Sequence, residues 1–549
     1  MTLSSSSSNT TSDALAAFYD EAAQLLGDAN VSRDHLTGNV KDQAGRDVYG
    51  DPFSAQDVNQ PAGAVRPATV EEVQAIVKLA NKHRVALWTV SRGKNLGYGG
   101  SGPVNGGVTV VLDLHRMNKI IEINEEYCYA IVEPGVSFFD LYEEIQRREL
   151  KLWPSVPAIG WGSVLGNTTD RGFGYTPNGE HSENQCGMEV VLPNGDLLRT
   201  GSGAMEDNKS WALYKGGFGP SFDGLFFQSN YGIVTKLGIQ MTPAPEAYAT
   251  IEIDVPREED LVPLTATLSD LMRRSIILNS SSLANIFRIA LTSRVPEVHA
   301  RLAQYMKPGS FVPDDVLEEI RVEQKWGFWR SYFALYSSVE MLPGIIKTVQ
   351  RAFSHIKGVN IVIREFAGEP GHYLSAPKDV GEEEIPHNGI PTIMPLGILN
   401  SRGGPGGAHT CFSPVIPPSG RELYDWYLTA KQRITDAKFD FFADFHVYPR
   451  YVVGIALVIY RLEEENGIYD LLDHLLHDGA QQGFFEYRTH VRYMDTVASK
   501  LKFNNSAHMR FATLLKDTLD PNGILSPGKS GVWNSEVVRA TKALKAAAL

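Results

Sequence analysis

The stretch Ser91-Arg-Gly-Lys-Asn-Leu-Gly-Tyr-Gly-Gly-Ser-Gly102 decides how the rest of the chain is interpreted. It directly follows Ala86–Val90, a run with the composition of a strand. Closely spaced glycines let the backbone turn its N–H groups toward an anion and approach it closely, and serine, lysine and asparagine add donors. The loop therefore indicates a binding site for a pyrophosphate group. A flexible surface loop is the alternative interpretation.

Two widespread phosphate-binding motifs do not describe this loop. The pair Gly93-Lys94 lacks the glycine spacing of a Walker loop. Gly97 to Gly102 spells GxGxxG, but Pro103 and a strand follow where a Rossmann motif requires a helix. The loop is therefore not a Walker loop and matches a Rossmann motif only weakly.

Two further segments strengthen the interpretation as a binding site. Residues Gly160 to Thr176 gather glycine and hydroxyl residues, as a second close approach of the backbone to a ligand would require. Gln228-Ser-Asn-Tyr-Gly-Ile-Val-Thr-Lys236 combines a tight turn with a strand that could lie under a flat ring. Several such segments suit a long ligand rather than a single phosphate.

The order of helical and strand patterns predicts a mixed α/β region followed by a second α+β region. In the first, Thr69–Asn81 is typical of a capped amphipathic helix. Further elements are expected at 86–90, 108–112, 129–132, 139–150 and 187–192, with a hairpin turn at Pro193-Asn-Gly195. In the second, helices are expected at 258–271 and 342–355 and a strand at 359–364. The turn-rich segment 520–529 predicts that the chain's end folds back on the first region.

Composition narrows the possible functions. The chain has 549 residues and a formal net charge of -13, which gives no basic surface for nucleic acid or anionic membranes. No run approaches the length of a membrane helix, and the polar start, residues 1–14, is expected to be a disordered tail. Its three scattered cysteines indicate neither a disulfide framework nor a metal site. We expect an intracellular, cytoplasmic protein without a metal.

A series of short motifs resembles the vanillyl-alcohol oxidase family of flavoproteins, specifically its 4-alkylphenol-oxidising branch. The motifs are Gly97-Tyr-Gly-Gly100, Val132-Glu-Pro-Gly135, Val164-Leu-Gly-Asn167, Gly172-Phe-Gly-Tyr-Thr-Pro177, Gly187-Met-Glu-Val-Val191, Gly217-Phe-Gly-Pro220, Asp520-Pro-Asn-Gly523 and Pro527-Gly-Lys-Ser-Gly531. The resemblance spans nearly the whole chain. It implies an α+β, two-domain fold of the p-cresol methylhydroxylase type: an FAD-binding domain at 15–245, a substrate cap domain at 246–500, and a segment at 501–549 that rejoins the first domain.

The same resemblance implies where FAD binds. Its positions in this chain are Ser91, Arg92, Gly93, Lys94, Asn95, Gly97, Pro134, Gly135, Gly162, Ser163, Gly166, Asn167, Asp170, Gly172, Tyr175, Gly232, Ile233, Val234 and Lys529. His409 matches the family's histidine that bonds covalently to the flavin, a bond that favours hydride acceptance. One branch uses a tyrosine several residues earlier instead, but Leu399, the residue nearby, cannot serve.

Tyr98, Tyr487 and Arg488 match the family's site for the phenol oxygen. Two hydroxyls and a guanidinium converging on one oxygen stabilise a phenolate. The phenolate has the electron density needed to expel hydride from the para benzylic carbon toward flavin N5. The alternative interpretation makes Tyr487 a core aromatic residue and Arg488 a surface charge.

Three positions depart from the family's pattern. Ala158 stands where the oxidases carry an aspartate beside the flavin. Val453 and Gly454 stand where relatives often carry a His-His pair, and we expect these smaller residues to widen the substrate cavity for a phenol bulkier than simple 4-alkylphenols. Near Phe53, a histidine that assists flavin attachment in the family is replaced.

The resulting expectation is an FAD-dependent oxidase of a para-substituted phenol that passes electrons to oxygen and forms hydrogen peroxide. A dehydrogenase that uses a cytochrome or a quinone is one alternative. A flavin-binding protein without redox turnover is another, and Ala158 keeps it open. A homodimer or higher homo-oligomer is the default expectation for the assembly.

Overall fold

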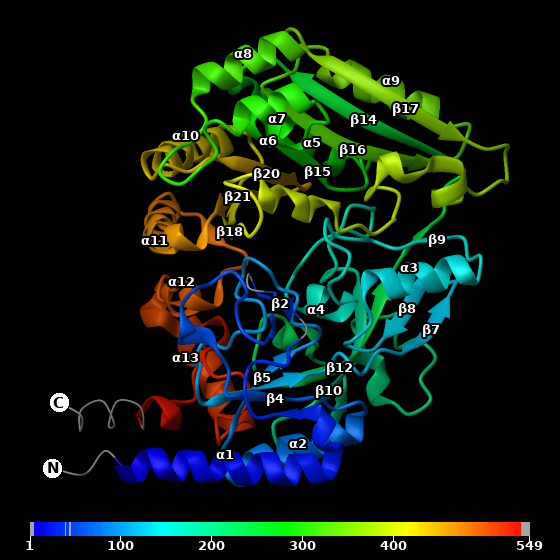
Figure 1. Cartoon of the computed structure of the whole chain (residues 1–549). Helices are drawn as coiled ribbons and strands as arrows, with labels where there is room; N and C mark the ends of the chain where they lie inside the picture. Colours follow the sequence, from blue (N-terminus) through cyan, green and yellow to red (C-terminus); the bar gives the residue numbers. More distant parts are fainter. Residues whose placement is uncertain (1–4, 39, 43–44, 540–549) are drawn as a thin grey trace.

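The computed structural model of the chain describes residues 5–38, 40–42 and 45–539. Figure 1 shows two halves stacked on each other, with the N-terminal and C-terminal parts of the chain in the lower half. The middle of the chain forms the upper half around one large sheet. The candidate site lies where residues of both halves meet.

The lower half contains two main sheets. The first has the order β1-β4-β6-β5, with β4, β5 and β6 parallel; the second has the order β11-β10-β12-β8-β7 and is antiparallel. Their strands are β1 (Val31–Ser32), β4 (Gly63–Val65), β5 (Ala86–Val90), β6 (Thr109–Asp113), β7 (Ile120–Asn124), β8 (Tyr129–Val132), β10 (Gln185–Val191), β11 (Leu197–Arg199) and β12 (Ile233–Gln240). Two small pairs complete this half: β2 (Val40–Lys41) with β3 (Asp47–Val48), and β9 (Leu152–Trp153) with β13 (Thr242–Pro243).

Helices α2, α3 and α4 of the lower half begin where the sequence supplies a cap. Thr69 accepts a hydrogen bond from the Glu72 N–H at the start of α2 (Val70–His83), which confirms the predicted capped helix. Helix α3 (Phe138–Arg147) ends before Glu149, whose φ of 53° is left-handed, and is therefore shorter than predicted. Helix α4 (Val164–Thr169) lies inside the second glycine-rich segment.

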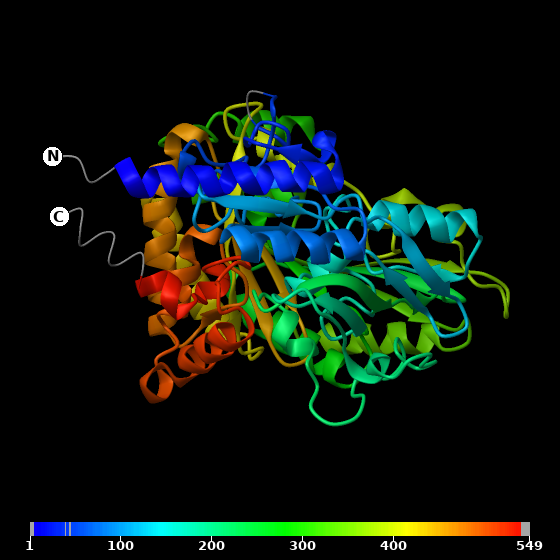
Figure 2. The ribbon, with the colours of Figure 1, turned by 90° about the horizontal axis from the view of Figure 1, so that it is seen from below.

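The expectation of a disordered tail over residues 1–14 is wrong from Ser5 onward. Helix α1 (Ser5–Leu26) runs beside α2, as Figures 1 and 2 both show. Its later part is anchored, since Phe18 and Ala22 are fully buried against the first sheet. The polar composition of residues 5–14 does not indicate that they form the beginning of this helix. Residues 1–4 lie outside the described part.

The upper half is built on a nine-stranded antiparallel sheet with the order β17-β14-β16-β15-β20-β21-β19-β22, and β18 also pairs with β21. The strands are β14 (Ala247–Val255), β15 (Ser281–Asn285), β16 (Trp329–Ser337), β17 (Asn360–Ala367), β18 (Ala408–Phe412), β19 (Pro414–Ile416), β20 (Phe442–Val447), β21 (Val452–Tyr460) and β22 (Phe485–Glu486). The accompanying helices are α5 (Leu261–Arg273), α6 (Ile286–Thr292), α7 (Pro296–Leu302), α8 (Asp314–Gln324), α9 (Leu342–Phe353), α10 (Arg421–Asp436) and α11 (Glu465–Gln481). One face of the sheet packs into a core that includes Trp329, Trp426 and Phe445.

The end of the chain lies against the lower half. After α12 (Met494–Ala498) and α13 (Phe503–Leu519), Leu525 forms a parallel bridge with Leu87 of β5. Ile524 and Leu525 belong to the same hydrophobic core as α1 and α2. Lys516 is fully buried and donates to the carbonyls of Asn230 and Leu525. These contacts bring Lys529 to the cavity described next.

Candidate functional site

A cavity of about 790 Å³ lies between the glycine-rich loops of the lower half and the sheet of the upper half. Its wall includes residues of strands and loops far apart in the chain, from Trp88 to Val532. Strands β18 and β21 contribute His409, Cys411, Ile455 and Leu457 from above. The cavity therefore has one wall of backbone loops and one wall of alternating strand residues.

Most residues predicted to bind FAD or a phenol line this single cavity. They are Ser91, Arg92, Gly93, Lys94, Asn95, Tyr98, Ala158, Gly162, Ser163, Gly166, Asn167, Asp170, Gly172, Tyr175, Gly232, Ile233, Val234, His409, Tyr487, Arg488 and Lys529. The fold thus brings together segments that are separated by more than four hundred residues. Gly97, Pro134, Gly135, Val453 and Gly454 are not part of the lining.

Three of these residues lie directly behind the lining. The Pro134 carbonyl accepts a hydrogen bond of 2.6 Å from the Ser163 hydroxyl, and the Gly135 carbonyl accepts one of 2.7 Å from Arg92 Nη1. Gly97 has a φ of 79°, and a side chain there would start 2.7 Å from His409 Nε2. Their contribution in this structure is to support Ser163, Arg92 and His409.

Gly454 does not face the cavity, so the expectation that it widens the cavity is wrong. A Cβ atom at Gly454 would lie 3.1 Å from both Ile416 and Trp426, on the core side of β21. Val453 lies on the other face and packs with Tyr98 and Cys411. The reason is the two-residue period of a strand, which turns neighbouring side chains to opposite faces.

The cavity wall has the features that a long polar cofactor such as FAD needs. A side chain at Gly166 would start 2.1 Å from the Ser91 hydroxyl, so only glycine allows the two loops to approach this closely. Among the described residues, Arg92 Nε, Ser229 Oγ and His409 Nδ1 are buried without a hydrogen-bond partner. Buried polar atoms are normally paired, and a bound ligand would pair them. The residues present therefore fit FAD.

His409 is presented by β18, where it pairs with Ile459 of β21. The Phe53 ring packs edge-on against its imidazole, with ring centroids 5.3 Å apart. Burial lowers the pKa of His409 to about 4, although Asp51 opposes that shift. The imidazole is therefore neutral near pH 7, the form that is nucleophilic.

Tyr98, Tyr487 and Arg488 form one cluster in the cavity wall. The Arg488 guanidinium carbon lies 4.2 Å from the centroid of the Tyr98 ring, within cation–π distance. Burial raises the pKa of both tyrosines, and Arg488 only partly opposes this. Both tyrosines are therefore neutral and able to donate a hydrogen bond, and the ionised groups in the cluster's surroundings are Arg488 and its partners.

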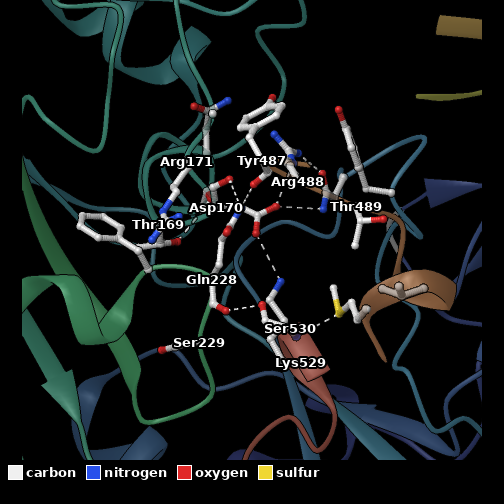
Figure 3. A pocket seen from close by; sticks show the side chains of 18 of the residues that line it. Thr169, Asp170, Arg171, Gln228, Ser229, Tyr487, Arg488, Thr489, Lys529 and Ser530 are labelled. Carbon is white, nitrogen blue, oxygen red and sulfur yellow. Dashed lines mark hydrogen bonds and ion pairs between the residues drawn. The ribbon is translucent and has the colours of Figure 1, made fainter. Parts of the chain in front are cut away.

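Asp170 connects this cluster to the loops of the lower half (Figure 3). Its Oδ2 atom lies 3.0 Å from Arg488 Nε, and its Oδ1 atom lies 3.3 Å from Lys529 Nζ. Burial would raise the pKa of Asp170, but Lys529 and Arg488 outweigh burial and hold it below the usual value. Asp170 is therefore a carboxylate between two cations.

Ala158 lines the cavity, so no carboxylate enters from that position. Among the described residues, the carboxyl groups in the lining are those of Asp170, Asp444 and Glu486. Asp444 pairs with Arg288 and His446, which hold its pKa below the usual value against the effect of burial. Glu486 forms no ion pair with another described residue, and burial raises its pKa to about 8, although a hydrogen bond from the Ser413 N–H opposes that shift. Near pH 7, Asp444 is therefore ionised and Glu486 is mostly protonated and neutral.

Asp444 was not predicted as a site residue. The signal was available in Phe442-Ala-Asp-Phe-His-Val447, where polar residues two apart interrupt a buried strand. No group of His, Cys, Asp and Glu within the described ranges is arranged to hold a metal ion. None of the described helices is both long and apolar enough to cross a membrane.

Comparisons with known proteins agree with this geometry. Residues 61–201 match the family model described as an FAD binding domain. The chain is 36% identical to the 4-cresol dehydrogenase [hydroxylating] flavoprotein subunit of Pseudomonas putida, over 86% of this chain and 88% of that protein. It is 30% identical to the 1'-carboxy-chondrochloren decarboxylase of Chondromyces crocatus, over 94% of this chain and 96% of that protein.

A solved structure extends the agreement to the fold. The 4-ethylphenol oxidase from Gulosibacter chungangensis, in its isoeugenol complex, superimposes with a TM-score of 0.84 and 31% identity, covering 96% of this chain and 98% of that one. Similarity at this level over both halves confirms the expected fold. The chain therefore belongs to the vanillyl-alcohol oxidase and p-cresol methylhydroxylase family of FAD-dependent oxidoreductases.

Proposed function

We propose that this protein is an FAD-dependent oxidase of para-substituted phenols. The observation that carries the proposal is the cluster of Tyr98, Tyr487 and Arg488 in the wall of the same cavity that the FAD-domain loops line. Two proteins similar over most of the chain carry the names 4-cresol dehydrogenase and 4-ethylphenol oxidase, which supports a phenolic substrate.

The cluster would bind the phenol oxygen and hold it as a phenolate. Tyr98 and Tyr487 are neutral and donate hydrogen bonds, while Arg488 supplies a positive charge. Hydrogen bonds to a charged oxygen are stronger than neutral ones, and burial strengthens them further. A phenolate has more electron density at its para carbon, which prepares the benzylic C–H bond for oxidation.

FAD would lie along the loops 91–102 and 160–176, with Ser91, Arg92, Asn167 and Lys529 as polar contacts. When bound, FAD supplies the acceptor for the two electrons that the substrate loses. We include His409 as the covalent attachment point, because its imidazole is neutral and its Nδ1 atom has no partner among the described residues. Gly97 leaves the room that this ring occupies.

Oxygen is the electron acceptor that we propose, with hydrogen peroxide as its product. The dehydrogenase named among the relatives favours a second candidate, transfer to a protein or quinone acceptor. The substrate class that we propose is para-substituted phenols. Gly454 gives no support for a bulkier phenol, because it faces Ile416 and Trp426 rather than the cavity. A homodimer or higher homo-oligomer remains our expectation for the assembly.

The test is oxygen uptake by purified protein given 4-ethylphenol, with the oxidised phenol and peroxide measured in the same samples. An oxidase consumes about one oxygen molecule for each phenol oxidised, as two-electron transfer requires. Oxidation that needs an added artificial acceptor would support the dehydrogenase instead. No oxidation with either acceptor, across a panel that includes vanillyl alcohol and eugenol, would refute the proposed function.

A further inference from the structure

Arg488 is held at two of its three guanidinium nitrogens by residues of the lower half. Nε lies 3.0 Å from Asp170 Oδ2 in an ion pair that lacks hydrogen-bond geometry, and Nη2 donates a hydrogen bond to Asn95 Oδ1. The flat face of the group lies against the Tyr98 ring, at 4.2 Å from its centroid. Neither polar contact uses Nη1.

Asp170 is itself fixed from several directions (Figure 3). Asn95 Nδ2 donates to Asp170 Oδ2 at 3.3 Å, and Lys529 Nζ lies 3.3 Å from Oδ1. The Gln228 side-chain amide donates to the Asp170 and Tyr487 carbonyls, at 3.3 and 2.9 Å, and so ties the two backbones together. A carboxylate held in this way cannot follow a moving guanidinium, so it restrains Arg488.

We propose that Asp170 and Asn95 are positioning residues that lock the Arg488 guanidinium in one orientation and leave Nη1 for the oxygen of a bound phenol. This assignment rests on the proposed function. Asp170 was predicted to contact FAD, whereas in this proposal it acts by orienting Arg488. A free arginine side chain samples many rotamers, and fixing it in one of them costs free energy. When neighbouring residues already hold the guanidinium in the right orientation, less of that cost is left to be met when a ligand binds.

A competing role for Asp170 predicts the opposite sign. If Asp170 only reduced the positive charge near the phenol oxygen, its removal would strengthen phenolate binding. If Asp170 positions Arg488, its removal weakens phenolate binding although the site becomes more positive. The direction of the change in affinity therefore separates the two roles.

The experiment uses FAD-loaded wild-type and Asp170→Asn proteins and the probe 4-nitrophenol, which has no benzylic hydrogen and absorbs visible light as its phenolate. Difference spectra across a pH series give its dissociation constant and its apparent pKa when bound. We expect wild type to bind the phenolate and to lower that pKa below the value in water. In D170N we expect roughly tenfold to hundredfold weaker binding, the usual effect of removing a charged partner from a buried group, with the pKa returning toward its value in water.

The double variant Asn95→Asp with Asp170→Asn is the matched control. It exchanges the carboxylate and the amide on the two sides of Arg488 and keeps the total charge. We expect it to recover most of the affinity and of the pKa shift lost in D170N. Unchanged or tighter binding in D170N with normal FAD content would overturn the proposal, as would a double variant no better than D170N.

A second variant covers the case in which D170N loses FAD. Asn95→Ala keeps the carboxylate between Lys529 and Arg488, and it removes both the amide oxygen that accepts from Nη2 and the amide nitrogen that donates to Asp170 Oδ2. We expect roughly threefold to tenfold weaker 4-nitrophenol binding, as for the loss of one neutral partner; unaltered binding in N95A would refute the role of Asn95 and hence the two-residue lock. If wild type itself binds no phenol, the proposed function fails instead, so the two failures are distinguishable.

Discussion

The two walls of the cavity bring their side chains to a ligand in different ways. In the loop wall, residues 91–102 and 160–176, neighbours in sequence are neighbours in space, and close approach depends on glycine, as at Gly166 against Ser91. In the sheet wall, alternate residues of β18, β20 and β21 face the cavity and the residues between them face the core. The loop wall therefore tolerates little added volume. In the sheet wall, by contrast, a single substitution can change the polarity or size of one side chain that faces the cavity.

The largest effect is expected at His409, where the sheet wall is proposed to hold FAD covalently. His409→Ala removes the ring nitrogen that would form the bond, so flavin should leave the protein on acid precipitation and give a colourless pellet. His508→Ala is the matched control, because His508 also lines the cavity and is not proposed to bond. A yellow H409A pellet would show that another residue carries the flavin.

The next effect is expected at Arg488, where the two walls meet. Arg488→Lys keeps a positive charge but loses the fork that contacts Asp170 and Asn95. We expect kcat/KM for 4-ethylphenol to fall by about a hundredfold or more, as when a donor to a developing oxyanion is removed. Arg171→Lys, also in the cavity lining, should stay near wild type. Equal losses in the two variants would contradict a specific role for Arg488.

A smaller effect, on stability, is expected from the two carboxyl groups of the upper half. The pKa of Glu486 is raised from 4.5 to about 8, so the folded state binds its proton more tightly than the unfolded state does. The stability that this provides is complete at pH 4 and is lost as the pH rises toward 8. Glu486→Gln avoids that loss, and its Tm should exceed that of wild type by a few degrees at pH 8 but not at pH 5.

Asp444 gives the opposite sign and serves as the control for Glu486. Its pKa is held below the usual value by Arg288 and His446, so its stabilising contribution is present at neutral pH and is lost only in acid. Asp444→Asn should therefore lower the Tm at pH 7. If E486Q and D444N shift the Tm in the same direction at pH 8, the assigned charge states are wrong.

The smallest effect separates the two faces of β21. Gly454→Ala places a methyl group 3.1 Å from Trp426 and Ile416, which should cost about 1 to 2 kcal/mol of stability and leave substrate preference unchanged. Val453→Ala, on the face shared with Tyr98, should change the ratio of kcat/KM between 4-ethylphenol and a bulkier 4-alkylphenol. If G454A changed the ratio of kcat/KM between the two phenols and left the Tm unchanged, Gly454 would face the cavity after all.

The same contrast explains how much of the site could be predicted from sequence. Ser91, Asn95 and Asp170, which the sequence predicts as FAD contacts, line the cavity, because glycine-rich loops carry their geometry in a short stretch of sequence. Gly454 was misplaced because the facing of a strand residue depends on register, which the local sequence here does not determine. The polar residues of β20 mark Asp444 in the local sequence, but its pairing with Arg288, 156 residues away in the chain, can be seen only in the structure. The start of α1 was missed because composition alone argued for a tail.

The central claim is that the cavity oxidises a phenol with FAD, and an anaerobic titration tests it most directly. Purified yellow protein is mixed with 4-ethylphenol without oxygen, and its visible spectrum is followed. The account predicts that the flavin absorption is bleached by about one equivalent of phenol, as a two-electron transfer requires, and returns when air is admitted. A spectrum that no para-substituted phenol of the panel bleaches, in protein with a full complement of FAD, would contradict it.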